Sequence, residues 1–307
     1  MTIQEKLKII KQTTGLTQTQ LAEKLGVSFV AFNNWWLGKS EPRAEKAEKI
    51  NELLLRVTGA SKIPADELAA KKMALVKRAK KYPNVLKKIL TIPNLRDAFV
   101  LKLTYHSNRI EGSTMTEPDT AAVIFKNIAL SNRTLTEQLE AKNHQTALLY
   151  LFDYLHAKKS INEVLVLKLH SILMNGILPD AGSYRRHAVR ILGVNLPTSN
   201  YLKIPDLLPD VIKEAQKKVK DPINQASAVH ARFEQIHPFS DGNGRIGRLL
   251  LNAILLKANY APAIIKQEEK KQYYDYLYKA QSEGDLSLFE NFLCDSVNEG
   301  YNILEAE

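Results

Sequence analysis

The chain has 307 residues, of which 45% are hydrophobic, enough for a sizeable core and for about two domains. Its single cysteine, Cys294, excludes an internal disulfide and a cysteine metal site. The most apolar run, residues 249–256, is interrupted by Asn252 and is shorter than the roughly 20 apolar residues of a bilayer span. We therefore expect a buried helix there and no membrane segment. With no apolar signal core after Met1, a cytoplasmic protein is predicted.

The net charge of +10 is unevenly distributed. Residues 1–90 contain 18 lysines and arginines but only 8 acidic residues, so the whole excess lies in the first third. This asymmetry favours a nucleic-acid partner for that third. The alternative is that these lysines are ordinary solvated side chains on helix surfaces.

Four short helices are predicted in residues 1–58, which form the expected first domain. Apolar residues at helical spacing mark the first helix, and a threonine or serine can cap the second and third. A glycine can end the second helix, at residue 25, and a proline opens the fourth. The markers are Ile3, Leu7 and Ile10, then Thr17 with Gly26, then Ser28, and finally Pro42.

A connector is predicted for residues 59–91, with a lysine-rich helix over 66–81. From residue 94, apolar residues three and four apart predict a series of helices in a domain that spans 92–307. Residues 189–197 are the exception, since they are β-branched and predict a short β-hairpin. The predicted helices cover residues 94–110, 136–156, 161–174, 204–219, 224–236, 245–258, 268–281 and 286–304.

A glycine-rich string, His-Pro-Phe-Ser-Asp-Gly-Asn-Gly-Arg-Ile-Gly-Arg, joins two of these helices at residues 237–248. Its glycines let backbone amides converge, and the following helix end adds partial positive charge. Arg245 and Arg248 share a helix face and can hold phosphate oxygens. Asp241 offers an oxygen ligand for Mg²⁺, which arrives with a nucleotide. His237 is placed to take a proton from an attacking hydroxyl, so the string favours polyphosphate chemistry.

Two other nucleotide motifs are excluded. Residues 242–247 match G-x-G-x-x-G, but that pattern needs a preceding buried strand, and here a helix precedes it. The P-loop pattern G-x-x-x-x-G-K-[ST] does not occur in the sequence. A packed histidine with surface arginines is the alternative without chemistry, and the density of glycine and polar positions disfavours it.

The string matches H-x-F-x-[DE]-G-N-G-R-x-x-R at every specified position and so resembles the Fic family, over about residues 94–300. Residues 182–193 resemble the stretch that leads into the family's β-hairpin flap, here 189–204. The resemblance implies a protein adenylyltransferase, which moves AMP from ATP to a Ser, Thr or Tyr hydroxyl (AMPylation) with Mg²⁺.

The resemblance also implies residue roles. His237 would be the base, Phe239 would anchor the loop, and Asp241 would hold Mg²⁺. Gly193, Val194 and Asn195 on the flap, with Tyr273 and Tyr274, would line the nucleotide and target cleft. The implied nucleotide-binding residues of the string are Asp241, Gly242, Asn243, Gly244, Arg245, Gly247 and Arg248.

Ser107 and Glu111 are four residues apart on one helix face, and Gly112 can end that helix in a left-handed cap. By spacing alone, an ordinary solvated helix end is favoured. Within a Fic-like chain, residues 107–112 resemble the family's inhibitory motif [ST]-x-x-x-E-[GN]. The resemblance implies that Glu111 pairs with Arg248 and denies it to the γ-phosphate. In some relatives the same glutamate supports removal of AMP, and the sequence leaves the dominant direction open.

Residues 16–42 resemble the Xre, or phage-repressor-like, helix-turn-helix family, which implies DNA binding through the third helix. Asparagine can pair with adenine, and glutamine can meet a phosphate. Exposed aromatic residues equally favour a protein-docking face. The expected core positions are Leu21, Ala22, Leu25, Val27, Phe32 and Trp35. The expected DNA contacts are Gln18, Phe29, Val30, Asn33 and Asn34.

The sequence thus predicts an all-α cytoplasmic protein with a helix-turn-helix domain and a Fic-like domain that carries a short β-hairpin flap. The leading function is ATP- and Mg²⁺-dependent AMPylation of a target protein, restrained by Glu111. One alternative is a DNA-binding transcriptional regulator whose Fic-like domain senses a nucleotide. Another is transfer of UMP, GMP or phosphocholine. The expected partners are a target protein and DNA, with a homo-oligomer left open and no membrane.

Overall fold

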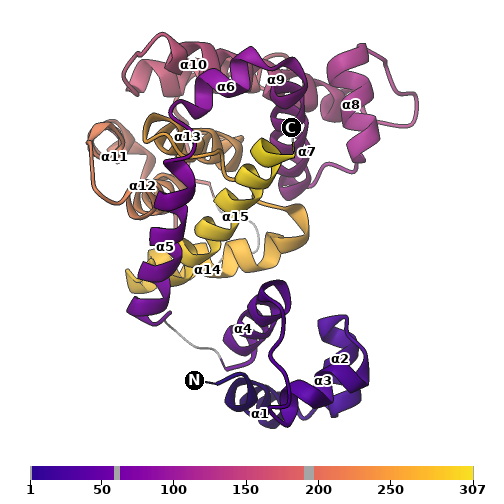
Figure 1. Cartoon of the computed structure of the whole chain (residues 1–307). Helices are drawn as coiled ribbons and strands as arrows, with labels where there is room; N and C mark the ends of the chain where they lie inside the picture. Colours follow the sequence, from indigo (N-terminus) through magenta and orange to yellow (C-terminus); the bar gives the residue numbers. More distant parts are fainter. Residues whose placement is uncertain (1, 59–62, 190–196, 307) are drawn as a thin grey trace. The chain divides into compact units, whose positions relative to one another are not determined.

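The computed structural model describes residues 2–58, 63–189 and 197–306. Backbone contacts divide the chain into two compact units, Met1–Ile63 and Pro64–Glu307 (Figure 1). Apart from an isolated bridge at Pro197, all regular secondary structure in the described residues is helical, which confirms the all-α class. No helix in these ranges is long and apolar enough to cross a membrane.

The N-terminal unit is built from four helices whose ends follow local signals. The Thr17 side chain accepts the Gln20 amide to cap the second helix, and Gly26 ends it in the left-handed conformation with φ 64°. Ser28 caps the third helix. The helices are α1 Ile3–Thr14, α2 Gln18–Leu25, α3 Phe29–Trp36 and α4 Ala44–Thr58.

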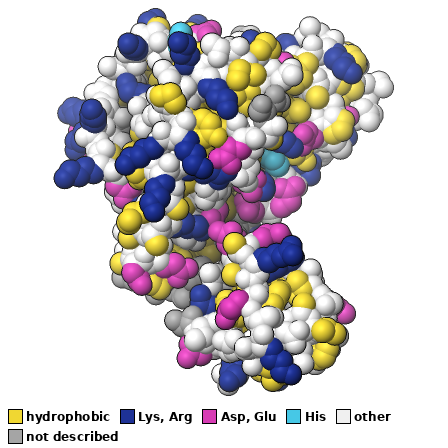
Figure 2. All heavy atoms as spheres, viewed as in Figure 1, with side chains coloured by type: hydrophobic (Ala, Val, Ile, Leu, Met, Phe, Trp, Pro, Cys, Tyr) yellow, Lys and Arg dark blue, Asp and Glu magenta, His cyan; other side chains and the backbone are white. Residues whose placement is uncertain are grey.

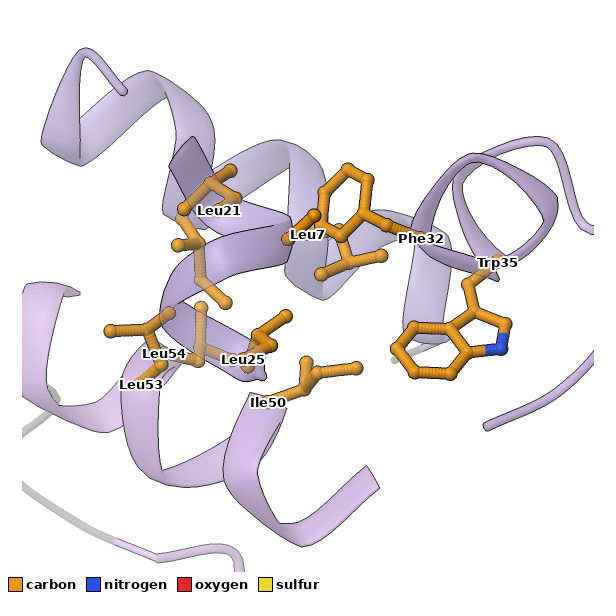
Figure 3. Packing of buried hydrophobic residues seen from close by; sticks show 10 residues of the cluster. Leu7, Leu21, Leu25, Phe32, Trp35, Ile50, Leu53 and Leu54 are labelled. Atoms are coloured by element: carbon orange, nitrogen blue, oxygen red, sulfur yellow. The ribbon is translucent and has the colours of Figure 1, made fainter. Parts of the chain in front are cut away.

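The core of this unit lies between the four helices (Figure 3). Leu7 of α1 and Phe32 of α3 are fully buried and lie beside one another there. The expected core positions are confirmed as buried, except that Val27 is partly buried. One face of α3 packs into the core through Phe32 and Trp35. The opposite face lies outside the core, and there Phe29 is 46% and Val30 is 68% exposed.

The C-terminal unit is organised around its most buried helix, α13 Asn243–Lys257. This helix contacts α7, α9, α10 and α12, and its apolar run at residues 249–256 is buried as expected. The glycine-rich string at residues 237–248 therefore leads into the central helix of the unit. The other helices are α5 Ala65–Ala79, α6 Val85–Thr91, α7 Pro93–Glu111, α8 Glu117–Lys126, α9 Leu135–His156, α10 Glu163–Leu173, α11 Ile204–Gln216, α12 Pro222–Ile236, α14 Lys270–Glu283 and α15 Ser287–Glu305, with short 3₁₀ turns at Tyr201–Lys203 and Gln267–Glu269.

The predicted connector does not stand apart from this unit, because α5 packs along α15 (Figure 1). Lys71 pairs with Asp295, and Arg78 pairs with Glu305 at 2.7 Å. Residues 64–90 carry 8 of the 18 basic residues of the first third. Part of the excess charge that favoured a nucleic-acid partner therefore belongs to the C-terminal unit and is paired inside it.

The sequence analysis missed two helices, α6, which lies in the predicted connector, and α8, whose signals could have been found. The signals of α8 are local: Thr116 and Asp119 form a capping box, Pro118 lies in the first turn, and Asn127 ends the helix in the left-handed conformation. The helix has only 10 residues, so apolar periodicity over a longer window does not reveal it.

The predicted β-hairpin falls mainly on residues 190–196, which lie outside the described residues, together with Gly193, Val194 and Asn195. The described ends of this segment are joined, because the Thr198 hydroxyl donates to the Val189 carbonyl at 2.8 Å.

Gly300 allows α15 to approach the backbone at Pro262. A Cβ at this position would lie 2.0 Å from the Pro262 carbonyl oxygen, which cannot move like a flexible side chain. We expect Gly300→Ala to lower the free energy of unfolding by about 1–3 kcal/mol or more, since overpacking forces the backbone to shift. Ser282→Ala on the exposed end of α14 is the control and should change it by less than about 0.5 kcal/mol. Urea denaturation measures both, and equal stabilities would contradict the close approach.

Candidate active site

The loop between α12 and α13 is fixed at both ends by left-handed residues. His237 ends α12 with φ 52°, and Gly242 precedes α13 with φ 79°. Asn243 closes the loop, because its Oδ1 accepts the Phe239 amide at 2.8 Å and its Nδ2 donates to the Phe239 carbonyl at 2.9 Å. The glycine-rich string therefore forms a compact turn that feeds a helix N-terminus.

Phe239 anchors this loop in the core. Its ring is fully buried and stacks on His170 with 3.7 Å between ring centroids. Burial lowers the pKa of His170 to about 4, so the ring is neutral near pH 7. Its Nδ1 accepts the Gly182 amide at 2.8 Å, and Nε2 then donates to the Asp241 carbonyl at 3.1 Å. One buried histidine thus fixes the loop through stacking and through the backbone.

Arg185 is a second anchor, which the sequence analysis did not select as a site residue. Its guanidinium is 2% exposed and donates to the carbonyls of His237 at 2.7 Å and Ile236 at 3.2 Å. It also donates to the carbonyls of His187 at 2.7 Å and Ser199 at 2.6 Å. This side chain therefore ties the described ends of the flap segment to the candidate base.

The N-terminus of α13 has no side-chain cap, whereas threonines cap α8 and α9. A Cβ at Gly244 would lie 2.3 Å from Oε1 of Glu111, so this carboxylate lies directly over the first turn. Uncapped amides and the helix dipole favour an anion at this point. In this structure the Glu111 carboxylate is that anion.

Glu111 is held there by Arg248. The Arg248 guanidinium is 5% exposed, with Nη2 2.6 Å from Glu111 Oε1 and Nε 3.0 Å from the Ser107 hydroxyl. Burial would raise the pKa of Glu111, but the charges of Arg248 and Arg245 outweigh it and lower the pKa. Nη1 of Arg248 is buried with no hydrogen-bond partner in the described part of the chain. Gly112 ends α7 with φ 111°, as expected.

Arg245 turns toward α9 rather than toward Glu111. Its guanidinium is buried, 2.7 Å from Glu140 Oε1 and 3.4 Å from Asp241 Oδ2. The Asp241 side chain is 60% exposed and accepts the Gly242 amide at 2.6 Å. An exposed carboxylate beside a helix N-terminus fits a hard cation that arrives with phosphate oxygens and water as its other ligands.

Two expected nucleotide contacts, Gly247 and Tyr273, lie elsewhere. Gly247 faces α12, since a Cβ there would lie 2.4 Å from Oε1 of Glu234. Tyr273 is fully buried, and its hydroxyl is 2.7 Å from Nε2 of His230, so it does not line an open cleft. Tyr274 is half-buried beside it, with 5.1 Å between the rings, and lies near enough to Glu111 and Arg248 to sense their charges.

The expected DNA contacts lie on α2 and α3 of the N-terminal unit. Phe29 and Val30 are exposed, whereas Gln18, Asn33 and Asn34 are half-buried. On the face shown in Figure 2, the basic side chains of this unit are interspersed with acidic and apolar ones.

Comparison with known proteins gives two family matches. Residues 160–255 match the model of the Fic/DOC family, and residues 7–55 match a helix-turn-helix model. The chain carries a Fic domain and a helix-turn-helix domain. Among solved structures, Fic-1 from C. elegans aligns with a TM-score of 0.69 at 22% identity, over 94% of this chain and 84% of that one. A Fic family protein from Desulfovibrio desulfuricans aligns with a TM-score of 0.66 at 25% identity, over 80% of this chain and 75% of that one.

Among curated relatives, the protein adenylyltransferase Fic of Drosophila mojavensis is 34% identical over 193 residues. The match covers 62% of this chain and 38% of that protein. The Drosophila grimshawi protein of the same name is also 34% identical, with 40% of its length covered. The chain therefore matches less than half the length of these relatives.

We expect Arg185→Ala to destabilise the Fic domain by about 2 kcal/mol or more, because buried carbonyls would lose their donor. Arg186→Ala is the matched control, since the neighbouring side chain is exposed and should cost less than about 0.5 kcal/mol. Urea denaturation of the two variants is the measurement. If both variants are equally stable, Arg185 does not hold the loop.

Proposed function

We propose that the Fic domain transfers AMP from ATP to a Ser, Thr or Tyr hydroxyl of a target protein, and that Glu111 restrains this transfer. The observation that carries the proposal is the Glu111 carboxylate over Gly244, bonded to Arg248, within the complete string at residues 237–248. An anion already occupies the helix end where the phosphates of a nucleotide would bind. The curated relatives named protein adenylyltransferase support the choice of reaction.

The N-terminus of α13 would hold the phosphates. Its free amides and dipole would stabilise negative charge on the α- and β-phosphates. The unpartnered Nη1 of Arg248 would complete its bonds with a γ-phosphate oxygen. Mg²⁺ would be held by Asp241 and would offset phosphate charge when bound.

His237 would be the general base. Its backbone is fixed by Arg185, and its Nδ1 is 3.1 Å from the Glu234 carbonyl, which leaves Nε2 to accept a proton. The hydroxyl oxygen of the target forms a bond to the α-phosphorus, and its proton passes to Nε2. The bond from the α-phosphorus to the bridging oxygen breaks, and pyrophosphate leaves.

The restraint follows from competition for one guanidinium. Glu111 is ionised at neutral pH because Arg248 lowers its pKa below its ordinary value despite burial. A γ-phosphate and this carboxylate would bring like charges to the same Arg248 guanidinium and the same helix end, and would repel each other there. ATP could then bind fully only when Glu111 moves away or is removed.

We expect Glu111→Gly to raise transfer of label from α-labelled ATP by roughly 5–150-fold, the range of a 1–3 kcal/mol coupling. Glu111→Gln, which keeps the shape without the charge, should give a smaller gain. Adding Arg248→Ala to Glu111→Gly should remove the gain, and adding His237→Ala should lower the rate by about 10²–10⁴-fold. The measurement is labelling of the protein itself and of cell lysate with Mg²⁺ present.

Parallel reactions with labelled UTP, GTP and CDP-choline test whether another group is transferred. Equal low activity of wild type and Glu111→Gly, with ATP binding intact, would contradict the restraint. No labelling by any donor in Glu111→Gly would contradict transfer and favour nucleotide sensing.

A second function, DNA binding, is favoured by the helix-turn-helix match at residues 7–55. We propose that the face of α3 outside the core meets DNA, with Asn33 and Asn34 as base-contact candidates. Residues 1–63 carry 10 basic and 6 acidic residues, so electrostatic attraction to DNA is modest.

For the full-length protein, we expect fluorescence anisotropy to detect DNA binding that weakens about tenfold or more between about 50 and 200 mM salt, as counterions are released. Asn33→Ala should weaken binding, whereas Gln12→Ala on the exposed side of α1 should not. Absence of binding at low salt to every DNA tried would favour a protein-docking face.

A further inference from the structure

Glu234 is a buried carboxyl that no motif in the sequence singled out. It lies in the last turn of α12, three residues before His237, and is 6% exposed. Its Oε1 is buried without a hydrogen-bond partner in the residues that the structure describes. Its Oε2 lies 3.7 Å from Nδ1 of His237. A buried carboxyl with an unpaired oxygen is costly, so its place beside the candidate base calls for a physical account.

Gly247 creates the space for this carboxyl. A Cβ at Gly247 would lie 2.4 Å from Oε1 of Glu234 and 2.9 Å from Cε1 of His230. The glycine therefore lets α12 and α13 pack with the carboxyl between them. Burial at this contact keeps the Glu234 side chain near the imidazole and away from bulk water.

Two oxygens of Glu234, its backbone carbonyl oxygen and Oε2, lie near Nδ1 of His237. The backbone carbonyl oxygen lies 3.1 Å from Nδ1, within hydrogen-bond distance, and Oε2 lies 3.7 Å from it, close enough for its charge to act on the ring. We infer that Glu234 is a positioning residue for His237. Its backbone carbonyl holds the base in the tautomer with Nε2 unprotonated, and its side chain, once ionised, stabilises the imidazolium that forms as Nε2 takes the hydroxyl proton. This inference rests on the proposed function for the reaction that the proton transfer serves.

The surrounding charges set when Glu234 ionises. Burial and the charge of Glu111 raise its pKa to about 8, and Arg248 opposes this. Burial and the charge of Arg185 lower the pKa of His237. As pH rises through about 8, Glu234 gains its negative charge and His237 becomes a stronger base. The groups that face this pair are Glu111 from α7, Arg248 from α13, Tyr273 and Tyr274 from α14, His230 from α12, Asp241 from the loop, and Arg185.

His230, Tyr273 and Tyr274 keep one charge state across this window. Burial lowers the pKa of His230 to about 3, so it stays neutral. Burial raises the pKa of Tyr273 and of Tyr274 above the ordinary tyrosine value, so both stay protonated. A change in the environment of His237 near pH 8 can therefore be assigned to Glu234.

The first test is an NMR titration of the full-length protein with ¹³C-labelled histidine, which needs no activity. The chain has 7 histidines, and the peak that His237→Ala removes identifies the ring. We expect the His237 peak to show a second step near pH 8, which Glu234→Gln abolishes. Glu290→Gln, at a carboxyl 4% exposed and bonded to Asn224, is the matched control and should keep the step. A wild-type titration without a second step would overturn the inference, even if Glu234→Gln does not fold.

The second test is kinetic and uses the Glu111→Gly background. Removing Glu111 removes a charge that raises the pKa of Glu234, so its ionisation should shift below pH 8 in this background. The ratio of the transfer rate of Glu111→Gly to that of Glu111→Gly with Glu234→Gln should therefore rise about tenfold between about pH 5.5 and pH 9. A constant ratio would mean that Glu234 only supports the fold, which overturns the inference. If the NMR step is present but Glu111→Gly transfers no group, the Glu234–His237 pairing stands and the proposed reaction falls.

Discussion

The Arg248 guanidinium is 5% exposed and meets the Glu111 carboxylate at 2.6 Å. Removing the partner of such a buried charge costs about 3–5 kcal/mol, so an anion is needed beside it at all times. Gly244 leaves room for one anion at the start of α13, because a Cβ at this position would lie 2.3 Å from Glu111 Oε1 and would exclude it. Under the proposed function, a carboxylate from α7 and a phosphate would therefore be mutually exclusive solutions to the same electrostatic requirement.

This requirement can act as a switch only if the rest of the site stays in place. Phe239 is stacked in the core, and the four carbonyl bonds of Arg185 fix the loop and the flap ends from the opposite side. By contrast, Glu111 is the last residue of α7, where Gly112 ends the helix. Helix ends fray more readily than buried interiors, so the Glu111 carboxylate can move more easily than the loop that Phe239 and Arg185 hold.

Local signals predicted much of this architecture. Thr17 and Gly26 act on their immediate neighbours, so the bounds of α2 could be predicted to the residue. The glycine-rich string at residues 237–248 could likewise be recognised from the sequence, because its histidine, glycines and arginines lie in one continuous segment. Arg185 and Glu234 were missed because their partners come from packing: carbonyls about 50 residues away for Arg185, and the space at Gly247 for Glu234. For the same reason, the expectation that Tyr273 lines a cleft failed, since only the tertiary fold buries it.

The charge asymmetry was counted over residues 1–90, but the structure places residues 64–90 in the C-terminal unit. Lys72 lies in the basic first third, but its ammonium lies between Asp221 and Glu290 of the C-terminal unit. Such cations balance internal carboxylates and add little to the attraction of DNA phosphates. The case for DNA thus depends on the surface of α3 rather than on net charge. Few cations surround α3, so the electrostatic contribution that dominates non-specific DNA binding would be small. If α3 binds DNA, its affinity must therefore come from base contacts or from more than one copy of the protein on the DNA.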